Sequence, residues 1–283
     1  MTLMRAGHRL RRVDPMTRAE SVPTPLIARM TSVEALIDVK LHRLGDLSND
    51  DRGQLAGLLT GRRRAAAGEA LVEEGSRPTF STLLLSGFVG RVSTLADGGR
   101  QITAINLPGD FIDLHGFLLK TMDHSLLALS DVTVAVVQHA DLKRVTEHAP
   151  RLARALWLET LIDAAIHRRW LVALGRRDAV TRLGQLICEL YLRLEAVALA
   201  QDHTFECPLT QSDLADMLGM SSVHVNRSLK VLRDTGLVRW RNGRVSIDDW
   251  TALTERVAFD ASYLDLKLSR SSSGAPIARR RTA

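Results

Sequence analysis

The chain has 283 residues, a formal net charge of +6 and 45% apolar residues. This length allows two domains with ordinary cores, and the apolar content is typical of a globular protein. No apolar run reaches the roughly 18–20 residues of a membrane helix, and the arginine-rich N-terminus lacks the apolar core of a secretory signal. The two cysteines, Cys188 and Cys207, form no motif, so we expect a reduced, cytoplasmic setting with no membrane association.

Both ends of the chain are predicted to be basic tails. Residues 1–35 are polar and arginine-rich, and Pro15, Pro23 and Pro25 interrupt any regular pattern. Residues 269–283 are rich in serine and arginine. Neither segment has enough apolar residues to offset the entropy lost on folding. We therefore expect a flexible N-terminal tail and a disordered C-terminal one.

Between the tails, the first domain changes from a helical to a strand-like pattern. Residues 40–67 have helical spacing, whereas 68–139 contain short runs rich in Val, Leu, Ile and Thr. Glycines, among them Gly87 and Gly90, separate these runs. Regular spacing of this kind predicts a compact all-β barrel or roll.

A long helix is expected over residues 141–174. Its apolar positions cover more than one narrow stripe, which indicates two packing partners. One partner would be the β-roll of the same chain and the other the same helix of a second subunit. A helix buried entirely within its own chain is the alternative. In the dimer interpretation, residues 146–175 form the dimerisation helix. Gly175, Arg176 and Asp178 are expected to form a hinge to the next helix.

The strongest functional signal lies in residues 210–247, which predict two helices, a tight turn between them and a hairpin. Thr210 caps the first helix, with Asp213 as the other half of an imperfect capping box. Gly219 ends that helix, because a left-handed backbone is cheap only for glycine, and Ser221 caps the second. Further signals are inward Leu214 and Leu218, buried Val225, Leu229 and Leu232, helix-ending Gly236, and the hairpin pair Asn242 and Gly243.

This pattern is that of a winged helix–turn–helix domain, predicted over residues 176–252 and followed by a C-terminal helix over 253–268. Such a domain places its second helix in the major groove of DNA. Residues 221–247 carry six basic residues and one acid, Asp234, which suits phosphate neutralisation. A solvated helical pair in an unrelated domain is the alternative. The residues expected to contact DNA are Ser221, Ser222, Val223, His224, Asn226, Arg227, Lys230, Arg241 and Arg244.

The order of β-roll, long helix, hinge and winged helix resembles the Crp/Fnr family of bacterial transcription regulators. The resemblance covers about residues 40–250 and rests on EEG at 73–75, LSG at 85–87, PGDFID at 108–113 and the helix–turn–helix. It implies an α+β protein with a cyclic-nucleotide-binding-like β-roll sensor at 36–145. It also implies a homodimer on a palindromic operator, with recognition helices about 34 Å apart, and contact with RNA polymerase.

The expected effector pocket departs from that of the family member that binds cyclic AMP. Aligned without gaps, the glutamate for the ribose falls on Leu114 and the arginine for the cyclic phosphate on His124, while the adjoining serine is kept as Ser125. A buried phosphate needs a fixed cation, and histidine supplies one only when protonated. We therefore do not expect a cyclic nucleotide. Asp113 and His115 complete the candidate pocket residues.

No other cofactor is predicted. Because no cysteine precedes Cys188, a four-cysteine iron–sulfur cluster within one chain is excluded. A haem-type gas or redox sensor using His115 or His124 remains an alternative, as does a true cyclic-nucleotide receptor, but no motif marks an axial ligand. The signal is therefore left unidentified.

The second helix of the DNA-binding motif also departs from the family's best-known pattern. There, Arg-Glu and a later Arg read a TGTGA-type half-site, whereas this chain starts with Ser222 and Val223 and matches only at Arg227. Valine cannot accept from cytosine N4, but Arg227 can bind guanine O6 and N7. We expect a less cytosine-dependent half-site, with a plain phosphate contact as the alternative for Arg227.

These features predict a homodimeric DNA-binding regulator without catalytic activity. The sequence shows no cluster of nucleophile and base, no metal-ligand spacing and no phosphate-binding loop. A ligand-binding regulatory protein whose C-terminal domain contacts another protein is the alternative from a different functional class.

Overall fold

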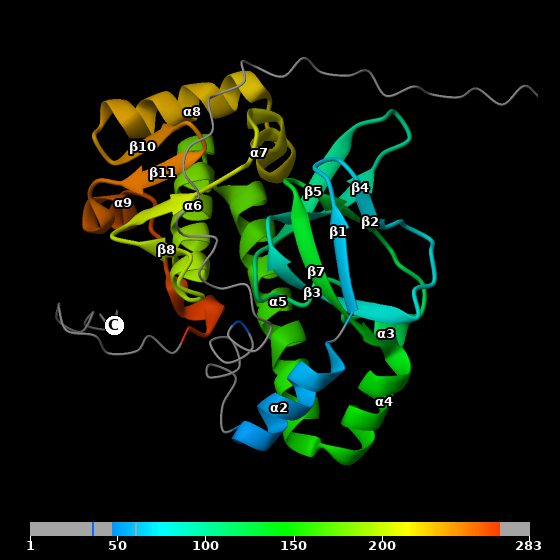
Figure 1. Ribbon diagram of the computed structural model, residues 1–283. Coiled ribbons are helices and arrows are strands. Elements are labelled where there is room, and N and C mark those ends of the chain that lie inside the picture. The colour runs from blue at the N-terminus through cyan, green and yellow to red at the C-terminus, as the bar shows by residue number, and fades with distance from the viewer. Residues whose placement is uncertain (1–35, 37–46, 60, 267–283) are drawn as a thin grey trace, which may run out of the picture.

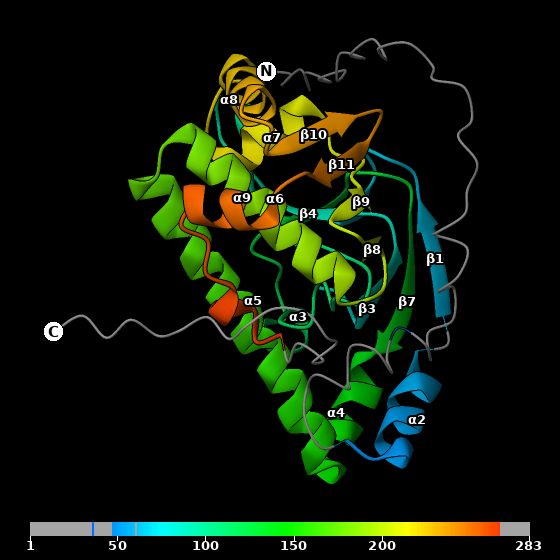
Figure 2. The same cartoon turned by 90° about the vertical axis from the view of Figure 1, so that its left-hand side faces the viewer.

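A β-roll, a long helix and a helix-rich C-terminal unit follow one another in the computed structural model, which describes residue 36 and residues 47–59 and 61–266 (Figures 1 and 2). The predicted α+β fold class is confirmed. The predicted tails, 1–35 and 269–283, lie outside the described residues. Within the described part of the chain, no helix has the length and apolar character needed to cross a membrane.

The first elements are a short helix and an edge strand. Helix α2 (Asn49–Leu58) begins after Ser48, whose hydroxyl accepts from the backbone N–H of Asp51 in a reciprocal capping box. Strand β1 (Gly61–Ala65) follows, so the helix predicted over 40–67 is wrong beyond α2. The chain is extended there because β1 pairs with β7 at the edge of a sheet, where its exposed arginines oppose further pairing.

Two antiparallel sheets form the β-roll, with strand orders β1-β7-β3 and β2-β6-β4-β5. The remaining strands are β2 (Ala70–Val72), β3 (Phe80–Ser86), β4 (Val89–Thr94), β5 (Arg100–Asn106), β6 (Ser125–Ala128) and β7 (Val132–Gln138). Leu84, Leu126 and Val134 are fully buried in the cluster between strands. The roll predicted from the glycine-separated runs is therefore present, with β1 added at its edge.

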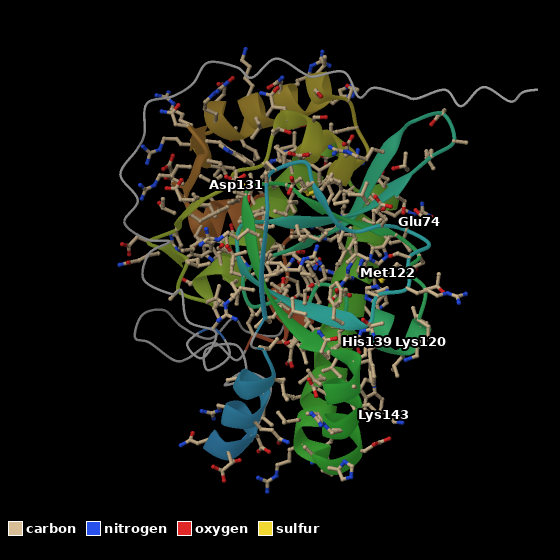
Figure 3. All side chains as sticks on the ribbon, turned by 45° about the vertical axis from the view of Figure 1, so that its right-hand side comes forward. Glu74, Lys120, Met122, Asp131, His139 and Lys143 are labelled. Carbon is tan, nitrogen blue, oxygen red and sulfur yellow. The ribbon has the colours of Figure 1, made fainter. Side chains whose placement is uncertain are left out.

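A single helical turn, α3 (Gly116–Leu119), lies between β5 and β6. It ends at Lys120, which has a left-handed backbone with φ of 67°. Figure 3 shows Lys120 close to His139, where the next helix begins. Burial, assisted by the charge of Lys120, lowers the pKa of His139, and the ring lies 3.1 Å from Ser81 Oγ.

Two helices stand where one was predicted over 141–174. Helix α4 (His139–His148) ends before Pro150, and α5 (Pro150–Arg176) starts there. Proline has no N–H to continue a helix but fits the first helical position, which explains the break. The break between α5 and the next helix lies at Arg177, within the segment from Gly175 to Asp178 predicted as a hinge, although Gly175 and Arg176 themselves are helical. Asp178 caps the following helix by accepting from Thr181 N.

The C-terminal unit contains the predicted helix–turn–helix and wing. Its elements are α6 (Ala179–Glu195), β8 (Ala200–Gln201), β9 (Thr204–Glu206), α7 (Gln211–Leu218), α8 (Ser222–Asp234), β10 (Val238–Arg241), β11 (Arg244–Ile247), α9 (Trp250–Arg256) and a 3₁₀ turn (Ala261–Leu264). Its sheet has the order β10-β11-β9-β8. The single helix predicted over 253–268 is wrong, because Ala258 has φ of 47° and interrupts the helix after α9. Residues 267 and 268 lie outside the described residues.

The C-terminal unit is docked on the β-roll. Arg100 of β5 forms ion pairs with Asp213 at 2.9 Å and with Asp216 at 2.6 Å, both on α7. Arg193 of α6 donates to the Ile105 carbonyl at 2.9 Å and pairs with Asp110 at 2.7 Å. Nothing in the sequence pattern predicted these contacts. They place α6 beside the cavity described below.

Candidate DNA interface and effector cavity

The helix–turn–helix is built by local signals that the sequence displays. Thr210 and Asp213 form a complete reciprocal capping box at the start of α7, where an imperfect one was expected. Gly219 follows α7 in the left-handed region, with φ of 58° and ψ of 46°. The Ser221 hydroxyl accepts from the His224 N–H and so caps α8. The hairpin turn has positive φ at both Asn242 and Gly243, the backbone of a type I′ turn.

Helix α8 separates a buried side from an exposed one. Val225, Ser228 and Leu232 are buried, and Leu229 is half-buried. All the predicted contact residues on this helix are exposed, as is its cap, Ser221. The residues on the helix are Ser222, Val223, His224, Asn226, Arg227 and Lys230. The exposed side chains therefore occupy the face that a major groove would meet.

The cations on this face differ in how firmly they are held. Arg227 and Lys230 form no ion pair with any residue that the structure describes, whereas Arg239 pairs with Asp248 at 2.6 Å. Arg244 lies 3.9 Å from Glu206, so its charge is partly offset. Asn226 donates to Gln211 Oε1 on α7 at 2.8 Å. The unpaired cations on α8 are thus available to DNA without breaking an internal contact, together with exposed Arg241 in the wing.

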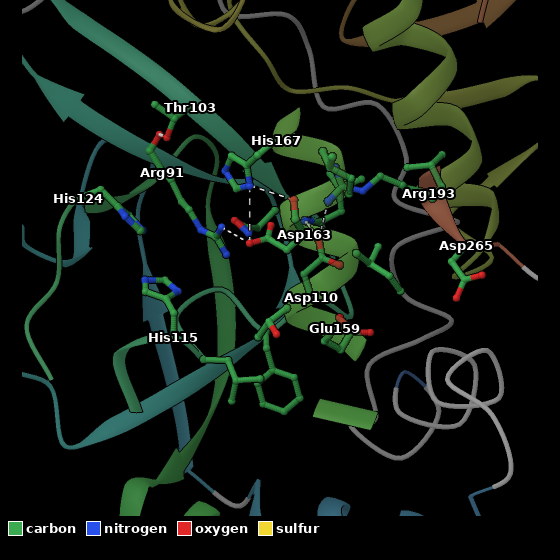
Figure 4. Close-up of a pocket in the computed structure, with 18 of the residues that line it drawn as sticks. Arg91, Thr103, Asp110, His115, His124, Glu159, Asp163, His167, Arg193 and Asp265 are labelled. Atoms are coloured by element: carbon green, nitrogen blue, oxygen red, sulfur yellow. Dashed lines mark hydrogen bonds and ion pairs between the residues drawn. The ribbon is translucent and has the colours of Figure 1, made fainter. Parts of the chain in front are cut away.

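A cavity of about 470 Å³ lies between the β-roll, α5 and α6 (Figure 4). Three of the five predicted effector residues line it, namely Leu114, His115 and His124. The other two do not. Asp113 is fully buried and accepts from the backbone N–H and hydroxyl of Thr82. Ser125 accepts from the backbone N–H of Glu74 at 3.0 Å.

Sequence reasoning missed a buried charge in the cavity wall, Arg91 of β4. This residue is 5% exposed, and its guanidinium is ion-paired with Asp163 of α5 (Figure 4). Its Nε also donates to the Ile112 carbonyl at 3.4 Å. The sequence around Arg91 gave no signal for this role, because its partner Asp163 lies 72 positions away along the chain. The pair joins the roll directly to the long helix.

Burial disfavours the charged forms of two of the three histidines that line the cavity, His115 and His124. Burial, followed by the charge of Arg91, lowers the pKa of His115 to about 4. Burial and Arg91 also lower the pKa of His124, although Asp123 beside it acts in the opposite direction. Burial therefore makes His124 a poorer source of the conditional cation considered in the sequence comparison. Two fixed cations line the cavity, and both are already balanced: Arg91 by Asp163, and Arg193 by Asp110 and Glu189.

The C-terminal unit and the β-roll each match a family model. Residues 181–256 match the Crp-like helix-turn-helix domain, and residues 62–149 match the cyclic nucleotide-binding domain. The nitrogen fixation regulation protein FixK of Bradyrhizobium diazoefficiens is 30% identical over 190 residues, which cover 67% of this chain and 79% of that protein. The chain belongs to the Crp/Fnr family of transcription regulators.

Further relatives agree with this assignment. The transcriptional activator protein FnrL of Cereibacter sphaeroides is 26% identical over 235 residues, covering 78% of this chain and 94% of that protein. The structure of FixK2 from Bradyrhizobium japonicum shares the fold, with a TM-score of 0.63, 23% identity, and coverage of 69% of this chain and 96% of that one. This Crp/Fnr protein is therefore a DNA-binding transcription regulator and not an enzyme.

Proposed function

We propose that this Crp/Fnr regulator reads a palindromic operator as a cytoplasmic homodimer that also contacts RNA polymerase. The observation that supports operator reading best is the exposed face of α8, where Arg227 and Lys230 carry charges that no described residue neutralises. Phosphate contacts from such cations supply affinity, and contacts with base edges supply specificity. The alternative, a C-terminal unit that contacts a protein, gives no reason for an unpaired cationic face.

The exposed side of α5 supports the homodimer. Large apolar side chains remain uncovered along this helix: Trp157 is 65% exposed, Leu161 50%, Leu171 72%, Val172 50% and Leu174 37%. The opposite side packs on the β-roll through Leu152, Ala155 and Leu156. A second copy of α5 would remove the apolar strip from water, and a two-fold axis there would present two α8 helices to one operator.

The start of α8 supports a half-site that depends less on cytosine than the family's best-known one. Val223 is 66% exposed and can pack on a thymine methyl group. Arg227, one turn further along, can donate to guanine O6 and N7. Ser222, His224 and Asn226 can reach either base edges or phosphates.

The cavity beside α5 is the place where we propose that the signal acts. Its Arg91–Asp163 pair joins the roll to the proposed dimer helix, so any ligand that displaces Asp163 would alter the packing of α5. A cyclic nucleotide is not favoured, because Leu114 stands where a ribose-binding glutamate would be needed. A haem-type sensor is not favoured either, because no motif marks an axial ligand.

Selection of bound sites from random duplexes tests the operator proposal. The full chain should enrich a two-fold symmetric site, and its affinity should fall steeply with salt. Arg227→Ala should cost about 1–3 kcal/mol on the preferred site and relax one base position in each half. Arg233→Ala is the matched control, because Arg233 is an exposed cation in the last turn of α8 and should weaken all sequences alike. Equal losses from both variants would reduce Arg227 to a phosphate contact, and absence of enrichment would favour the protein-contacting alternative.

Sedimentation tests the homodimer. Trp157→Glu puts a charge into the exposed apolar strip and should raise the dimer dissociation constant at least tenfold, while Lys143→Glu on α4, also exposed, should not. A wild-type monomer would contradict the dimer proposal.

Calorimetry with cyclic AMP and cyclic GMP tests the effector. Micromolar binding of either nucleotide would contradict the interpretation of Leu114 and His124.

A further inference from the structure

Three potential metal ligands converge at the wall of the cavity. His115 precedes α3, and Asp123 and His124 lie in the short link from α3 to β6. One ligand atom from each of the three residues can be chosen so that all lie within 4.8 Å of one another. Figure 4 shows the His115 and His124 rings facing each other, and their centroids are 4.9 Å apart.

Both imidazoles have an unused nitrogen. The Nε2 atoms of His115 and His124 are buried and have no hydrogen-bond partner among the described residues. A buried polar atom without a partner requires an explanation, and an unfilled site for an ion is one such explanation. Two such atoms on facing rings, both in the wall of one cavity, indicate a shared occupant.

We propose that His115, Asp123 and His124 bind a divalent transition-metal ion of the Zn²⁺ class. Imidazole nitrogen with carboxylate oxygen is a donor set for zinc and neighbouring metals, whereas Ca²⁺ and Mg²⁺ prefer oxygen alone. Three protein ligands leave a fourth position, which faces the cavity. The site would therefore be open to a small ligand rather than closed and structural.

The geometry needs only a limited adjustment. Tetrahedral zinc has ligand bonds of about 2.0–2.2 Å, which places ligand atoms roughly 3.3 Å apart. Asp123 Oδ1 and His124 Nδ1 are 2.8 Å apart, a hydrogen-bond contact that would open to this spacing if both atoms bound the metal. His115 would complete the set, since one of its ring nitrogens lies within 4.8 Å of ligand atoms of the other two residues. Should His124 bind through its unpartnered Nε2 instead, Asp123 would hold Nδ1 in the carboxylate–histidine–metal arrangement and would not itself bind the metal.

The local charge permits a cation. Arg91 is a positive group that acts on both histidines, but its guanidinium is ion-paired with Asp163, so the two together are neutral. Asp123 then supplies the negative charge of the site, with His115 and His124 as neutral donors. A bound metal would repel the Arg91 guanidinium and so act on the connection to α5. This regulatory consequence rests on the proposed function, whereas metal binding does not.

Metal titration of the full, tag-free chain tests the site. Protein stripped with a chelator should bind one Zn²⁺ per chain by calorimetry, and Co²⁺ in its place should give the intense visible absorption of a tetrahedral site. His115→Gln and His124→Gln should each lower the affinity at least tenfold, as should Asp123→Asn. His148→Gln is the matched control, because His148 is exposed on α4, and it should leave the affinity unchanged. Ca²⁺ and Mg²⁺ at the same concentrations should not compete.

Several results would overturn the proposal. These are sub-stoichiometric binding, affinity that survives the His115→Gln/His124→Gln double variant, or a Co²⁺ spectrum unchanged by that variant. Circular dichroism of each metal-free variant separates a lost ligand from a lost fold. If a variant unfolds, the wild-type protein can be tested instead. Acid should abolish its Co²⁺ absorption, and bound Zn²⁺ should protect His115 and His124 from alkylation; absence of either effect would contradict the site. One Zn²⁺ per chain in a protein that enriches no DNA site would support the metal site and refute the proposed function.

Discussion

Replacing Asp113 by asparagine should stabilise the protein above neutral pH. The side chain is fully buried beside Thr82, accepting from its backbone N–H at 2.6 Å and from its hydroxyl at 3.1 Å. Burial raises the pKa of Asp113 to about 7, even though the Thr82 hydrogen bonds favour the charged form. An asparagine of the same shape keeps the carbonyl acceptor for the N–H and offers an amide donor to the Thr82 hydroxyl oxygen.

The size of the effect follows from the two pKa values. In the unfolded chain Asp113 titrates near 3.8, so between about pH 4 and pH 7 the folded protein holds a proton that the unfolded chain has lost. Stability contributed by the neutral carboxyl is therefore complete below about pH 4 and declines as the pH rises to about 7. At about 1.4 kcal/mol per pH unit, the decline is roughly 4 kcal/mol, an upper bound for a group this buried.

Urea unfolding of the wild type and of Asp113→Asn across this pH range measures the decline. The variant should gain stability relative to the wild type as the pH rises, and the gain should level off above neutrality. His115, whose pKa is lowered, contributes the opposite trend, but it is present in both proteins and cancels in the difference. A difference that stays constant with pH would refute the argument and show that Asp113 is ionised throughout.

Three further substitutions test the packing of α5, α6 and α7. Gly184→Ala would place a Cβ 2.5 Å from Val257 Cγ1 and should cost about 1–3 kcal/mol in urea unfolding, largely restored by Val257→Ala. Gly175→Ala meets no atom within 4 Å and should add about 0.5–1 kcal/mol to the stability of helical α5; a loss of DNA affinity instead would show that bending at this glycine is needed. Arg100→Ala should leave global stability within about 1 kcal/mol, since the guanidinium is partly exposed, yet it should speed hydrogen exchange in α7. Unchanged exchange there, or no similar effect from Asp216→Asn, would mean that these ion pairs do not hold the two units together.

The DNA-binding segment was predictable because its signals are local. The Thr210–Asp213 box, the left-handed Gly219 and the Asn242–Gly243 turn each act within four residues, so the sequence shows them directly. The errors arose where a competing local signal was outweighed. Pro150 marked the break between α4 and α5, but the apolar pattern on both sides obscured it.

The arrangement of the cavity was harder to predict, because its contacts join distant segments. Arg91 pairs with Asp163, and Arg193 pairs with Asp110. These residues are far apart in sequence and come together only when the chain folds, so no sequence spacing predicts the pairs. His115 and His124 were identified by position in a motif, yet their facing rings and unpartnered nitrogens appear only in three dimensions. Asp113 was assigned to the pocket from the same motif, although its side chain points to Thr82.

The packing of α6 on the roll has a consequence for modularity. Ile102 and Ile105 of β5 share one buried cluster with Leu183 and Leu190 of α6, so the β-roll and the DNA-binding unit have a common interior. A C-terminal fragment that begins at Asp178 would expose the apolar face of α6 that packs on β5. Such a fragment is a poor candidate for fusion to another domain. The same continuity means that substitutions deep in the β-roll can shift DNA affinity without touching DNA. Inheritance of the two halves as a unit, rather than their exchange, is the evolutionary behaviour that such an interior favours.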